Sequence, residues 1–396
     1  MSERIRVLRV IARLNMGGPA HHVGLVSGLL DQDRYETVLV HGEVGAGEAS
    51  LSSTADGLGV HRETVPGLRP ELRPRDDLRA LVWLVRRVRA YRPHIVHTHT
   101  AKAGMLGRLA AVLAGRPRPI IVHTYHGHVL EGYFGPLQNA FYRGLERGLG
   151  RISDVLIGVS QATVDDLVRL RIAPRSKFRV VPIGLDLDRF FEPPAGAGEQ
   201  FRSEAGVAPD DVLVSYVGRL AAIKRIDVML RTLAQARRLG APVRLVLVGD
   251  GERRAELEAL ATDLGVSEHV WFAGYREDVV PVAAGADIAL LTSDNEGTPV
   301  SLIEGAAAAN PAVATAVGGV ADVVTSQTGI LAPAADYDRL AAGLADLGLS
   351  ADKRQRMGTA AREHVRTRFS AQRLVEDIDR LYRELIGTHN KTMVTS

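Results

Sequence analysis

The stretch Ser293-Asp-Asn-Glu-Gly-Thr-Pro-Val-Ser-Leu-Ile-Glu304 predicts a loop that follows a buried strand and enters a helix. An apolar run at residues 286–291 precedes it, and apolar residues at helical spacing follow over residues 300–309. Thr298 suits the cap of that helix and Pro299 its first position, where a missing N–H costs nothing. The unpaired N–H groups at a helix start favour an anion. The stretch therefore predicts an α/β domain with an anion site at this loop.

Two carboxylates, Glu296 and Glu304, flank the start of this helix. Glu304 would lie roughly one and a half turns down the helix, about 7 Å along its axis. Hydroxyl groups on either side of a bound anion could then each reach a carboxylate, which is the arrangement that suits a sugar nucleotide. The alternative is that both carboxylates are solvated surface groups.

Length and composition indicate a globular chain with at least two domains. Of the 396 residues, 46% are hydrophobic and 24% charged, and the sequence has neither a membrane-spanning apolar run nor a signal-peptide pattern. The absence of cysteine excludes disulfides, thiolate metal sites and a cysteine nucleophile. We therefore expect a cytoplasmic protein.

Charge is distributed unevenly along the chain. Residues 1–190 contain 27 Lys and Arg against 18 Asp and Glu, whereas the remainder contains 22 against 28. A basic half favours an anionic partner, either phosphate groups or a membrane surface. Residues 77–91 predict an amphipathic helix with an Arg-rich face, which could lie peripherally on the inner face of the plasma membrane. The alternatives are a solvated surface and a helix that packs on a sheet.

Strand and helix patterns alternate in two blocks, which predicts an α/β protein with two Rossmann-like, doubly wound parallel sheets. A segment rich in Pro and Gly at residues 191–198 separates the blocks. We therefore expect an N-terminal domain over residues 1–190 and a C-terminal domain over residues 191–370. Residues 371–386 predict a final helix.

Ligands of open parallel sheets bind beyond the carboxyl ends of the strands. Most polar clusters in this sequence directly follow a predicted strand, so we expect loops of both domains to face one interdomain cleft. These clusters are residues 15–18, 97–102, 123–128, 218–224, 249–251, 274–276 and 293–298.

Three residues in these clusters suggest phosphate and sugar chemistry. Arg219 and Lys224 follow one predicted strand, where they could bind the oxygens of a diphosphate. His126 follows another strand and could contact a reacting sugar hydroxyl. The alternative in each case is an ordinary surface residue.

The sequence contains no recognisable metal motif. Histidines at positions 97, 99, 123, 126 and 128 match no zinc spacing, and Asp31-Gln-Asp33 and Asp186-Leu-Asp188 are isolated acidic pairs. Nucleic-acid motifs, a P-loop and a Gly-x-Ser-x-Gly elbow are also missing. We therefore expect no metal, no cofactor and no nucleic-acid partner.

A series of short motifs runs along the chain. They are Gly17-Gly18-Pro-Ala-His-His-Val23, His97-Thr-His-Thr-Ala-Lys-Ala-Gly104, His123-Thr-Tyr-His-Gly-His128, Val217-Gly-Arg-Leu-Ala-Ala-Ile-Lys224, Val248-Gly-Asp-Gly251, the pair Glu296 and Glu304, and Val317-Gly-Gly319. In this order the chain resembles the family 4 glycosyltransferases, which share the two-domain GT-B fold and retain the configuration of the transferred sugar. The likeness is greatest to the bacterial branch that acts on lipid-linked or cell-surface glycans. Ile183 before Gly184 and Asp322 depart from the residues that are common in the family.

The resemblance implies a role for each motif. Glu296 would hold hydroxyls of the donor sugar, Glu304 would hold the ribose, and His126 would lie beside the reacting sugar. Arg219 and Lys224 would bind the diphosphate, with help from the backbone of the Gly17-Gly18 loop and of residues 297–301. Residues 274–276 would lie near the base. The full set of donor-binding residues is Gly17, Gly18, Arg219, Lys224, Gly274, Tyr275, Arg276, Gly297, Thr298, Pro299, Val300, Ser301 and Glu304.

For the acceptor, the candidate contacts are His99 and Lys102, which could meet the acceptor or a phosphate on it. The final helix over residues 371–386 would pack back on the N-terminal domain, as is typical of the family.

These expectations together describe a metal-independent, retaining hexosyltransferase. It would move a sugar from a nucleotide diphosphate sugar, UDP being the expected nucleotide, to a glycan or lipid-linked acceptor in polysaccharide or glycolipid biosynthesis. The rivals are a GT-B-fold UDP-sugar 2-epimerase, a non-catalytic sugar-nucleotide-binding subunit and a nicotinamide-dependent dehydrogenase. The first should have further N-terminal carboxylates, the second should have lost His126 or one of the Glu pair, and the third needs a three-glycine turn.

Overall fold

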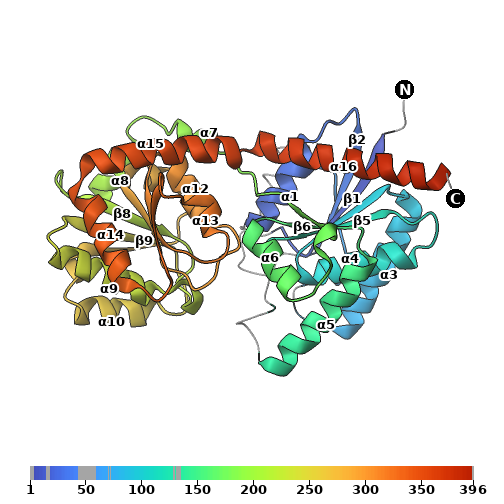
Figure 1. The fold of residues 1–396 in the computed structure, drawn as a ribbon, viewed down its shortest axis with the longest axis horizontal. Helices are drawn as coiled ribbons and strands as arrows, with labels where there is room; N and C mark the ends of the chain where they lie inside the picture. Colours follow the sequence, from blue (N-terminus) through green and yellow to red (C-terminus); the bar gives the residue numbers. More distant parts are fainter. Residues whose placement is uncertain are drawn as a thin grey trace. The chain divides into compact units, whose positions relative to one another are not determined.

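The computed structural model describes residues 4–14, 18–42, 59–69, 71, 73–127, 130 and 135–394, with side chains up to residue 389. Figure 1 shows the chain as two units, which we describe separately. Unit 1 comprises Met1–Leu185 and Ala371–Ser396, and unit 2 comprises Asp186–Ser370.

Unit 1 is built on a seven-stranded parallel sheet of order β3-β2-β1-β4-β5-β6-β7. Its strands are β1 (Ile5–Ile11), β2 (Tyr35–His41), β3 (Arg62–Thr64), β4 (Ile95–His99), β5 (Ile120–Tyr125), β6 (Val155–Gly158) and β7 (Phe178–Val180). Its helices are α1 (Gly18–Leu29), α3 (Pro74–Tyr91), α4 (Ala101–Leu113), α5 (Pro136–Ile152), α6 (Gln161–Arg169), the 3-10 turn η1 (Arg175–Lys177) and α16 (Ala371–Val394).

Unit 2 has a six-stranded parallel sheet of order β10-β9-β8-β11-β12-β13. The strands are β8 (Val212–Val217), β9 (Val243–Val248), β10 (Val270–Gly274), β11 (Ile288–Leu291), β12 (Ala312–Thr315) and β13 (Gly329–Ala332). The helices are α7 (Asp188–Phe191), α8 (Ala197–Glu204), η2 (Ala222–Lys224), α9 (Ile226–Arg238), α10 (Arg254–Asp263), η3 (Ser267–His269), α11 (Val280–Gly285), α12 (Val300–Ala307), α13 (Val320–Val323), α14 (Tyr337–Leu349) and α15 (Ala351–Arg368).

Two doubly wound parallel sheets confirm the predicted fold class. In each sheet the strand order runs outward in one direction from the first strand of the unit, β1 or β8, and then in the other direction. The loops beyond the carboxyl ends of the strands at this reversal can hold a ligand. The edge strands β3 and β13 were not predicted. β3 is three residues long and polar, and β13 begins with a glycine, so neither has the apolar run that marks the other strands.

The chain passes from unit 1 to unit 2 after Leu185, five residues before the predicted boundary at residue 190. The difference arises because α7 belongs to unit 2, where Phe190 is buried. The segment of Pro and Gly that suggested a linker instead connects α7 to α8 within unit 2.

The C-terminal helix α16 completes the core of unit 1. Leu374, Ile378 and Tyr382 are fully buried in one apolar cluster with residues of β1, β4, β5 and β6. The N–H of Ala371 donates to the carbonyl of Leu185 (3.0 Å), so the two points where the chain enters and leaves unit 1 are bonded together.

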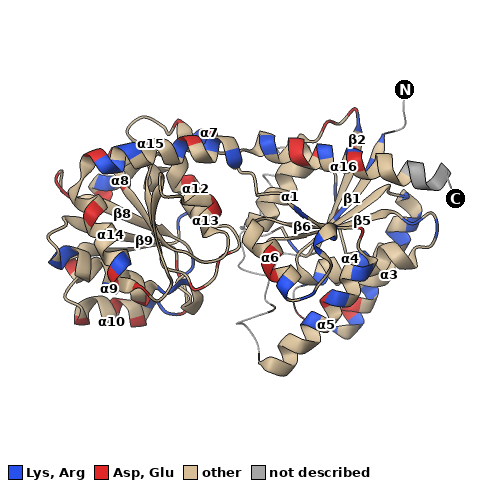
Figure 2. Ribbon diagram, viewed as in Figure 1, with Lys and Arg blue, Asp and Glu red and all other residues tan. Residues whose placement is uncertain are grey.

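The basic helix α3 packs on the sheet by a narrow face that excludes some of its apolar side chains. Ala80, Leu84 and Val88 are buried, whereas Leu78 and Val82 are 62% and 41% exposed. Figure 2 shows Lys and Arg gathered along α3 and α5. Within the part of the chain that the structure describes, no helix combines the length and the apolar character needed to cross a membrane.

Replacing Ile378 by Ala should lower the free energy of unfolding of unit 1 by about 3 kcal/mol, because the substitution leaves a cavity under the sheet. Urea unfolding followed by circular dichroism would measure the change. The exposed Gln372 on the same helix provides a matched control, and Gln372→Ala should change stability by less than about 0.5 kcal/mol. Equal effects of the two changes would mean that α16 does not contribute to this core.

Candidate active site

Glu296 forms an ion pair with Lys224 in unit 2, so two of the predicted donor-binding residues touch each other. Lys224 Nζ and Ser293 Oγ each donate to Glu296 Oε1 over 2.6 Å. Lys224 ends η2 beyond β8, and Glu296 lies in the loop between β11 and α12. The Glu296 side chain is only 10% exposed. Charge-assisted bonds to a nearly buried carboxylate hold it in one position.

Arg219 lies near this pair without an ion-pair partner of its own among the described residues. The hydroxyl of Tyr216 donates to the Arg219 carbonyl (3.0 Å), and the charges of both Glu296 and Arg219 act on that hydroxyl. Burial, followed by the charge of Glu296, raises the pKa of Tyr216, which keeps it neutral. Lys224 thus bonds the Glu296 carboxylate directly, and the Arg219 backbone is bonded to Tyr216, whose hydroxyl is influenced by both charges.

Close backbone contacts hold the loops beyond the strand ends together. The N–H of Gly319 donates to the Glu296 carbonyl (3.1 Å), and a Cβ at Gly318 would lie 1.8 Å from that oxygen. A Cβ at Gly249 would lie 2.0 Å from the Gly218 carbonyl oxygen. Gly318 and Gly249 also have positive φ angles, +48° and +134°, so a larger residue at either position would displace its neighbour.

Glu304 lies half-buried in α12 and has no ion-pair partner among the residues that the structure describes. Burial raises its pKa to about 7, against the opposing positive charge of Arg189. A ligand hydroxyl that donates to this carboxylate would replace part of the lost hydration. The position is therefore chemically suited to the hydroxyls of a ribose.

The helix after the loop starts one residue later than predicted. α12 begins at Val300, with Ser301 in its first turn and Pro299 at the cap position. Thr298 was expected to be the cap, and this was wrong: its hydroxyl is buried without a partner, and no side chain caps the helix. Pro299 has an extended backbone (φ −77°, ψ 99°), so the helix cannot start there.

Two predicted contacts are engaged elsewhere. Arg276 pairs with Glu204 of α8, and its guanidinium lies 5.1 Å from the centroid of the Trp271 ring. Lys102 is buried, pairs with Asp77 and donates to the Glu71 carbonyl. Both cations therefore have protein partners in this conformation, and their contact with a ligand stays a prediction.

The remaining predicted donor positions lie on the loops. Gly274 ends β10 with φ +72°, and Tyr275 follows it with 62% of its surface exposed. Gly297 lies in the loop beside Glu296. Gly18 is the first residue of α1, whereas Gly17 lies outside the described residues.

In unit 1, His126 is part of a cluster of neutral histidines. His99 ends β4 and His126 follows β5, and His99 Nδ1 lies 3.1 Å from His126 Nε2. His22 of α1 completes the cluster, with its ring centroid 4.9 Å from that of His126. Burial lowers the pKa of His126 to about 3 and that of His22 and His99 well below the usual value. The rings are therefore neutral, with a hydrogen bond between His99 and His126 and a ring contact between His22 and His126.

His22 was not predicted as a site residue, because the sequence marks it only as the second of two histidines after the Gly-Gly-Pro stretch. A supporting layer below the cluster was not predicted either. The Tyr382 hydroxyl of α16 accepts from Arg9 Nη2 (3.2 Å) and bonds His97 Nδ1 (2.6 Å), and His97 Nε2 bonds Thr124 Oγ1 (2.7 Å). All four side chains are buried, so α16 anchors the strand ends that carry His99 and His126.

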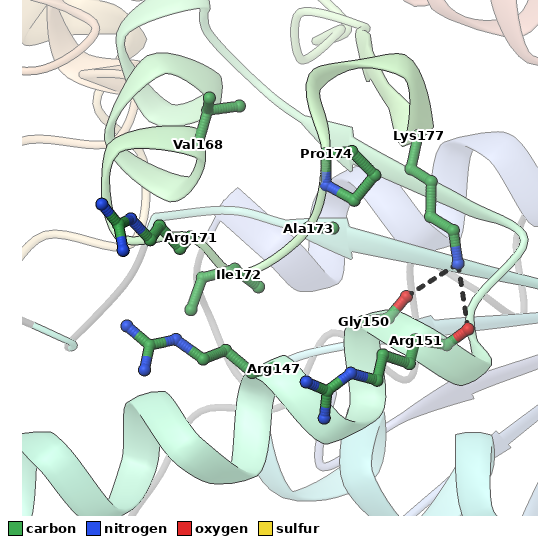
Figure 3. Close-up of a pocket in the computed structure, with 9 residues that line it drawn as sticks. All are labelled: Arg147, Gly150, Arg151, Val168, Arg171, Ile172, Ala173, Pro174 and Lys177. Carbon is green, nitrogen blue, oxygen red and sulfur yellow. Dashed lines mark hydrogen bonds between the residues drawn. The ribbon is translucent and has the colours of Figure 1, made fainter.

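A basic hollow of about 500 Å³ lies on unit 1 between α5 and the turn after α6 (Figure 3). Lys177 Nζ donates to the carbonyls of Gly150 and Arg151 (3.0 and 2.9 Å) and so caps the C-terminal end of α5. Among the described residues, the guanidiniums of Arg151 and Arg171 have no acidic partner. The hollow is lined by Arg147, Gly150, Arg151, Val168, Arg171, Ile172, Ala173, Pro174 and Lys177. It lies by the amino ends of β6 and β7, away from His99 and His126.

Comparison with known proteins identifies relatives of both units. Residues 16–189 match the model described as Glycosyltransferase Family 4, and residues 198–364 match that of Glycosyl transferases group 1. The chain is 34% identical over 305 residues to the D-inositol 3-phosphate glycosyltransferase of Corynebacterium jeikeium, covering 74% of this chain and 72% of that protein.

A second relative is the UDP-Gal:alpha-D-GlcNAc-diphosphoundecaprenol alpha-1,3-galactosyltransferase of Escherichia coli. It is 27% identical over 247 residues, 61% of this chain and 63% of that protein. The crystal structure of Anabaena HepE in complex with UDP and glucose superposes with a TM-score of 0.81. The likeness spans 96% of this chain and 100% of that chain at 20% identity, and so concerns the fold alone.

The raised pKa of Glu304 makes the stability of unit 2 depend on pH. In the folded state Glu304 keeps its proton up to pH about 7, whereas in the unfolded chain its pKa is the ordinary glutamate value of 4.5. Glu304 therefore lowers the stability as pH rises from about 4.5 to 7, and Glu304→Gln should remove that loss. Relative to the parent, the variant should gain on the order of 2 kcal/mol between pH 5 and 8, after allowance for partial exposure.

Urea unfolding at the two pH values measures this gain. The exposed Glu199 provides a control, and Glu199→Gln should leave the pH profile of the parent unchanged. A Glu304→Gln profile parallel to that of the parent would show that Glu304 ionises normally.

Proposed function

Because the chain belongs to glycosyltransferase family 4, we propose that it is a retaining transferase that uses a nucleotide diphosphate sugar, with UDP as its nucleotide. The acceptor is a hydroxyl of a growing cell-surface polysaccharide or glycolipid. The observation that carries this proposal is the contact of Glu296 with Lys224 and Ser293, close to Arg219. This contact places a cation that can bind phosphate and a carboxylate that can bind sugar hydroxyls side by side, beyond the carboxyl ends of β8 and β11.

Binding of the donor would redistribute these contacts. The diphosphate carries more negative charge than one carboxylate and accepts bidentate bonds, so it would draw on both Arg219 and Lys224. Glu296 would then accept hydrogen bonds from hydroxyls of the donor sugar. Glu304 would accept from the ribose, and Gly274 and Tyr275 would lie near the base.

In the transfer itself, the bond between the anomeric carbon and the β-phosphate oxygen breaks, and its electron pair leaves with the diphosphate. The acceptor oxygen bonds to the same face of that carbon, and its proton passes to the departing phosphate oxygen. Arg219 and Lys224 stabilise the charge that develops on the diphosphate. These fixed cations supply the stabilisation, so the proposed reaction uses no metal ion.

His126 would act beside the reacting sugar as a neutral group. Because burial lowers its pKa to about 3, the ring can donate one hydrogen bond and accept another near neutral pH. The bond between His99 Nδ1 and His126 Nε2 (3.1 Å) fixes the orientation of the His126 ring, with Nε2 towards His99. We assign His126 a positioning and polarising role towards the sugar.

The acceptor side of the proposal rests on the basic unit 1. The Escherichia coli relative is named for a diphosphoundecaprenol-linked acceptor, and we propose a lipid-linked acceptor for this chain too. The basic hollow would then contact anionic lipid headgroups. On α5, Leu137 is 89% and Phe141 66% exposed, and such apolar side chains beside arginines suit a membrane surface.

Glu296→Gln should lower turnover by about two orders of magnitude, because the amide cannot replace the charge-assisted contacts made in the transition state. Release of UDP, GDP or ADP from a panel of nucleotide sugars, with the acceptor product identified by mass spectrometry, measures the activity and the donor together. Glu252→Gln, an exposed glutamate in the same unit, is the control and should retain full turnover. Near-normal turnover of Glu296→Gln would remove its assigned role.

Vesicles that contain phosphatidylglycerol should sediment the protein, and added salt should weaken this binding because screening reduces exposed charge interactions. Arg151→Ala combined with Arg171→Ala should reduce binding severalfold. The pair Arg79→Ala and Arg86→Ala on α3 is the matched control. The reverse ranking would assign the contact to α3, and binding that is absent or insensitive to salt would exclude an electrostatic membrane contact.

A further inference from the structure

Three histidine rings of unit 1 converge beyond the carboxyl ends of β4 and β5. One nitrogen from each of His22, His99 and His126 lies within 4.8 Å of those from the other two rings. His99 Nδ1 and His126 Nε2 are 3.1 Å apart. Two nitrogens on one tetrahedral zinc ion lie about 3.3 Å apart, given bonds of about 2.0–2.1 Å. Two of the rings therefore already have nearly the spacing that a shared metal ion requires.

Several nitrogens of this cluster are buried and have no hydrogen-bond partner among the residues that the structure describes. They are both ring nitrogens of His22, His99 Nε2 and His126 Nδ1. Buried polar atoms nearly always have a partner, because an unpaired one destabilises the fold. His22 is only 1% exposed, and a ligand at its ring would displace no protein contact. A metal ion bound by His99 Nδ1 and His126 Nε2 would replace the hydrogen bond between them, and each ring would then carry its proton on its other nitrogen. His22 can supply the third ligand atom from its ring.

The imidazole nitrogens of the three histidines determine which kind of ion the cluster can bind. A neutral imidazole has one nitrogen with a lone pair, so each of the three rings can supply one ligand atom to a metal ion. Neutral imidazole binds Zn²⁺, Cu²⁺ and Ni²⁺, whereas Mg²⁺ and Ca²⁺ prefer oxygen ligands. The buried guanidinium of Arg9, which donates to Tyr382 in the layer below the cluster, would weaken binding of a cation. Loading should therefore be reversible rather than permanent.

We propose that His22, His99 and His126 form an inhibitory site for a divalent metal ion of the zinc type. Three imidazole nitrogens would bind the ion and leave a fourth position for water. Coordination would occupy the lone pair of His126 and fix its ring, so that it no longer serves the reacting sugar. The binding half of this proposal stands on the cluster alone, whereas the inhibitory half rests on the proposed function.

Calorimetric titration of the metal-stripped full chain with Zn²⁺ tests the binding half. The parent should bind one ion per chain, and His22→Gln should weaken binding by about tenfold or more, since even outer-shell changes weaken metal sites that much. His21→Gln, the neighbouring histidine on the same helix, should bind like the parent. No binding by the parent, or equal binding by His22→Gln, would overturn the proposal.

Transfer assays with added Zn²⁺ test the inhibitory half. Zn²⁺ should inhibit the parent and His21→Gln, whereas His22→Gln should keep its own metal-free turnover, whatever that is, when Zn²⁺ is added. EDTA should leave transfer intact and reverse the inhibition. Binding that depends on His22 but causes no inhibition would support the site and refute the role given to His126. An enzyme without turnover in any metal-free assay would refute the proposed function while the titration still decides the metal site.

Discussion

The close approach of backbone loops at the carboxyl edge of the unit 2 sheet is the constraint on which the donor site depends. The carbonyl of Glu296 accepts from Gly319, and Gly318 leaves no space for a side chain beside it. The loop beyond β12 thereby fixes a carboxylate that belongs to the loop beyond β11. Lys224, from the turn beyond β8, then meets this carboxylate. The ion pair is thus a product of backbone geometry, since three separate strand ends must be in register to form it.

The two units provide contrasting electrostatic environments. In unit 2, Lys224 Nζ and Ser293 Oγ both donate to the Glu296 carboxylate, and such a cation beside polar groups suits a diphosphate. In unit 1, burial keeps the rings of His22, His99 and His126 neutral. Neutral rings can orient a hydroxyl group without attracting phosphates, so the two units offer different chemistry to the proposed donor.

Much of this organisation could be predicted from the sequence, because buried parallel strands are apolar runs and their polar ends are conspicuous. The runs before Arg219, His126 and Ser293 all formed strands at the expected places. Short edge strands such as β3 lack that signal. The boundary after Leu185 could not be placed, since the burial of Phe190 depends on contacts with helices far along the chain.

Side-chain partners were harder to predict than backbone positions. Lys102 follows a strand, as a ligand-binding residue would, but its nearest acidic group is Asp77 of another helix. His22 joined the histidine cluster through the packing of α1, which no spacing rule describes. Distance along the chain carries little information about such contacts, and these were the residues whose neighbours the sequence did not reveal.

The placement of α16 sets an order of folding during synthesis. Unit 2 is a continuous segment and can bury its core as soon as residue 370 has left the ribosome. Unit 1 begins first but lacks Leu374, Ile378 and Tyr382 until all of unit 2 has been synthesised. At about 5–20 residues per second, its sheet waits roughly ten to forty seconds for the helix that covers it. The first unit to emerge is therefore the last to be finished, and its apolar strands are the part of the nascent chain most exposed to chaperones.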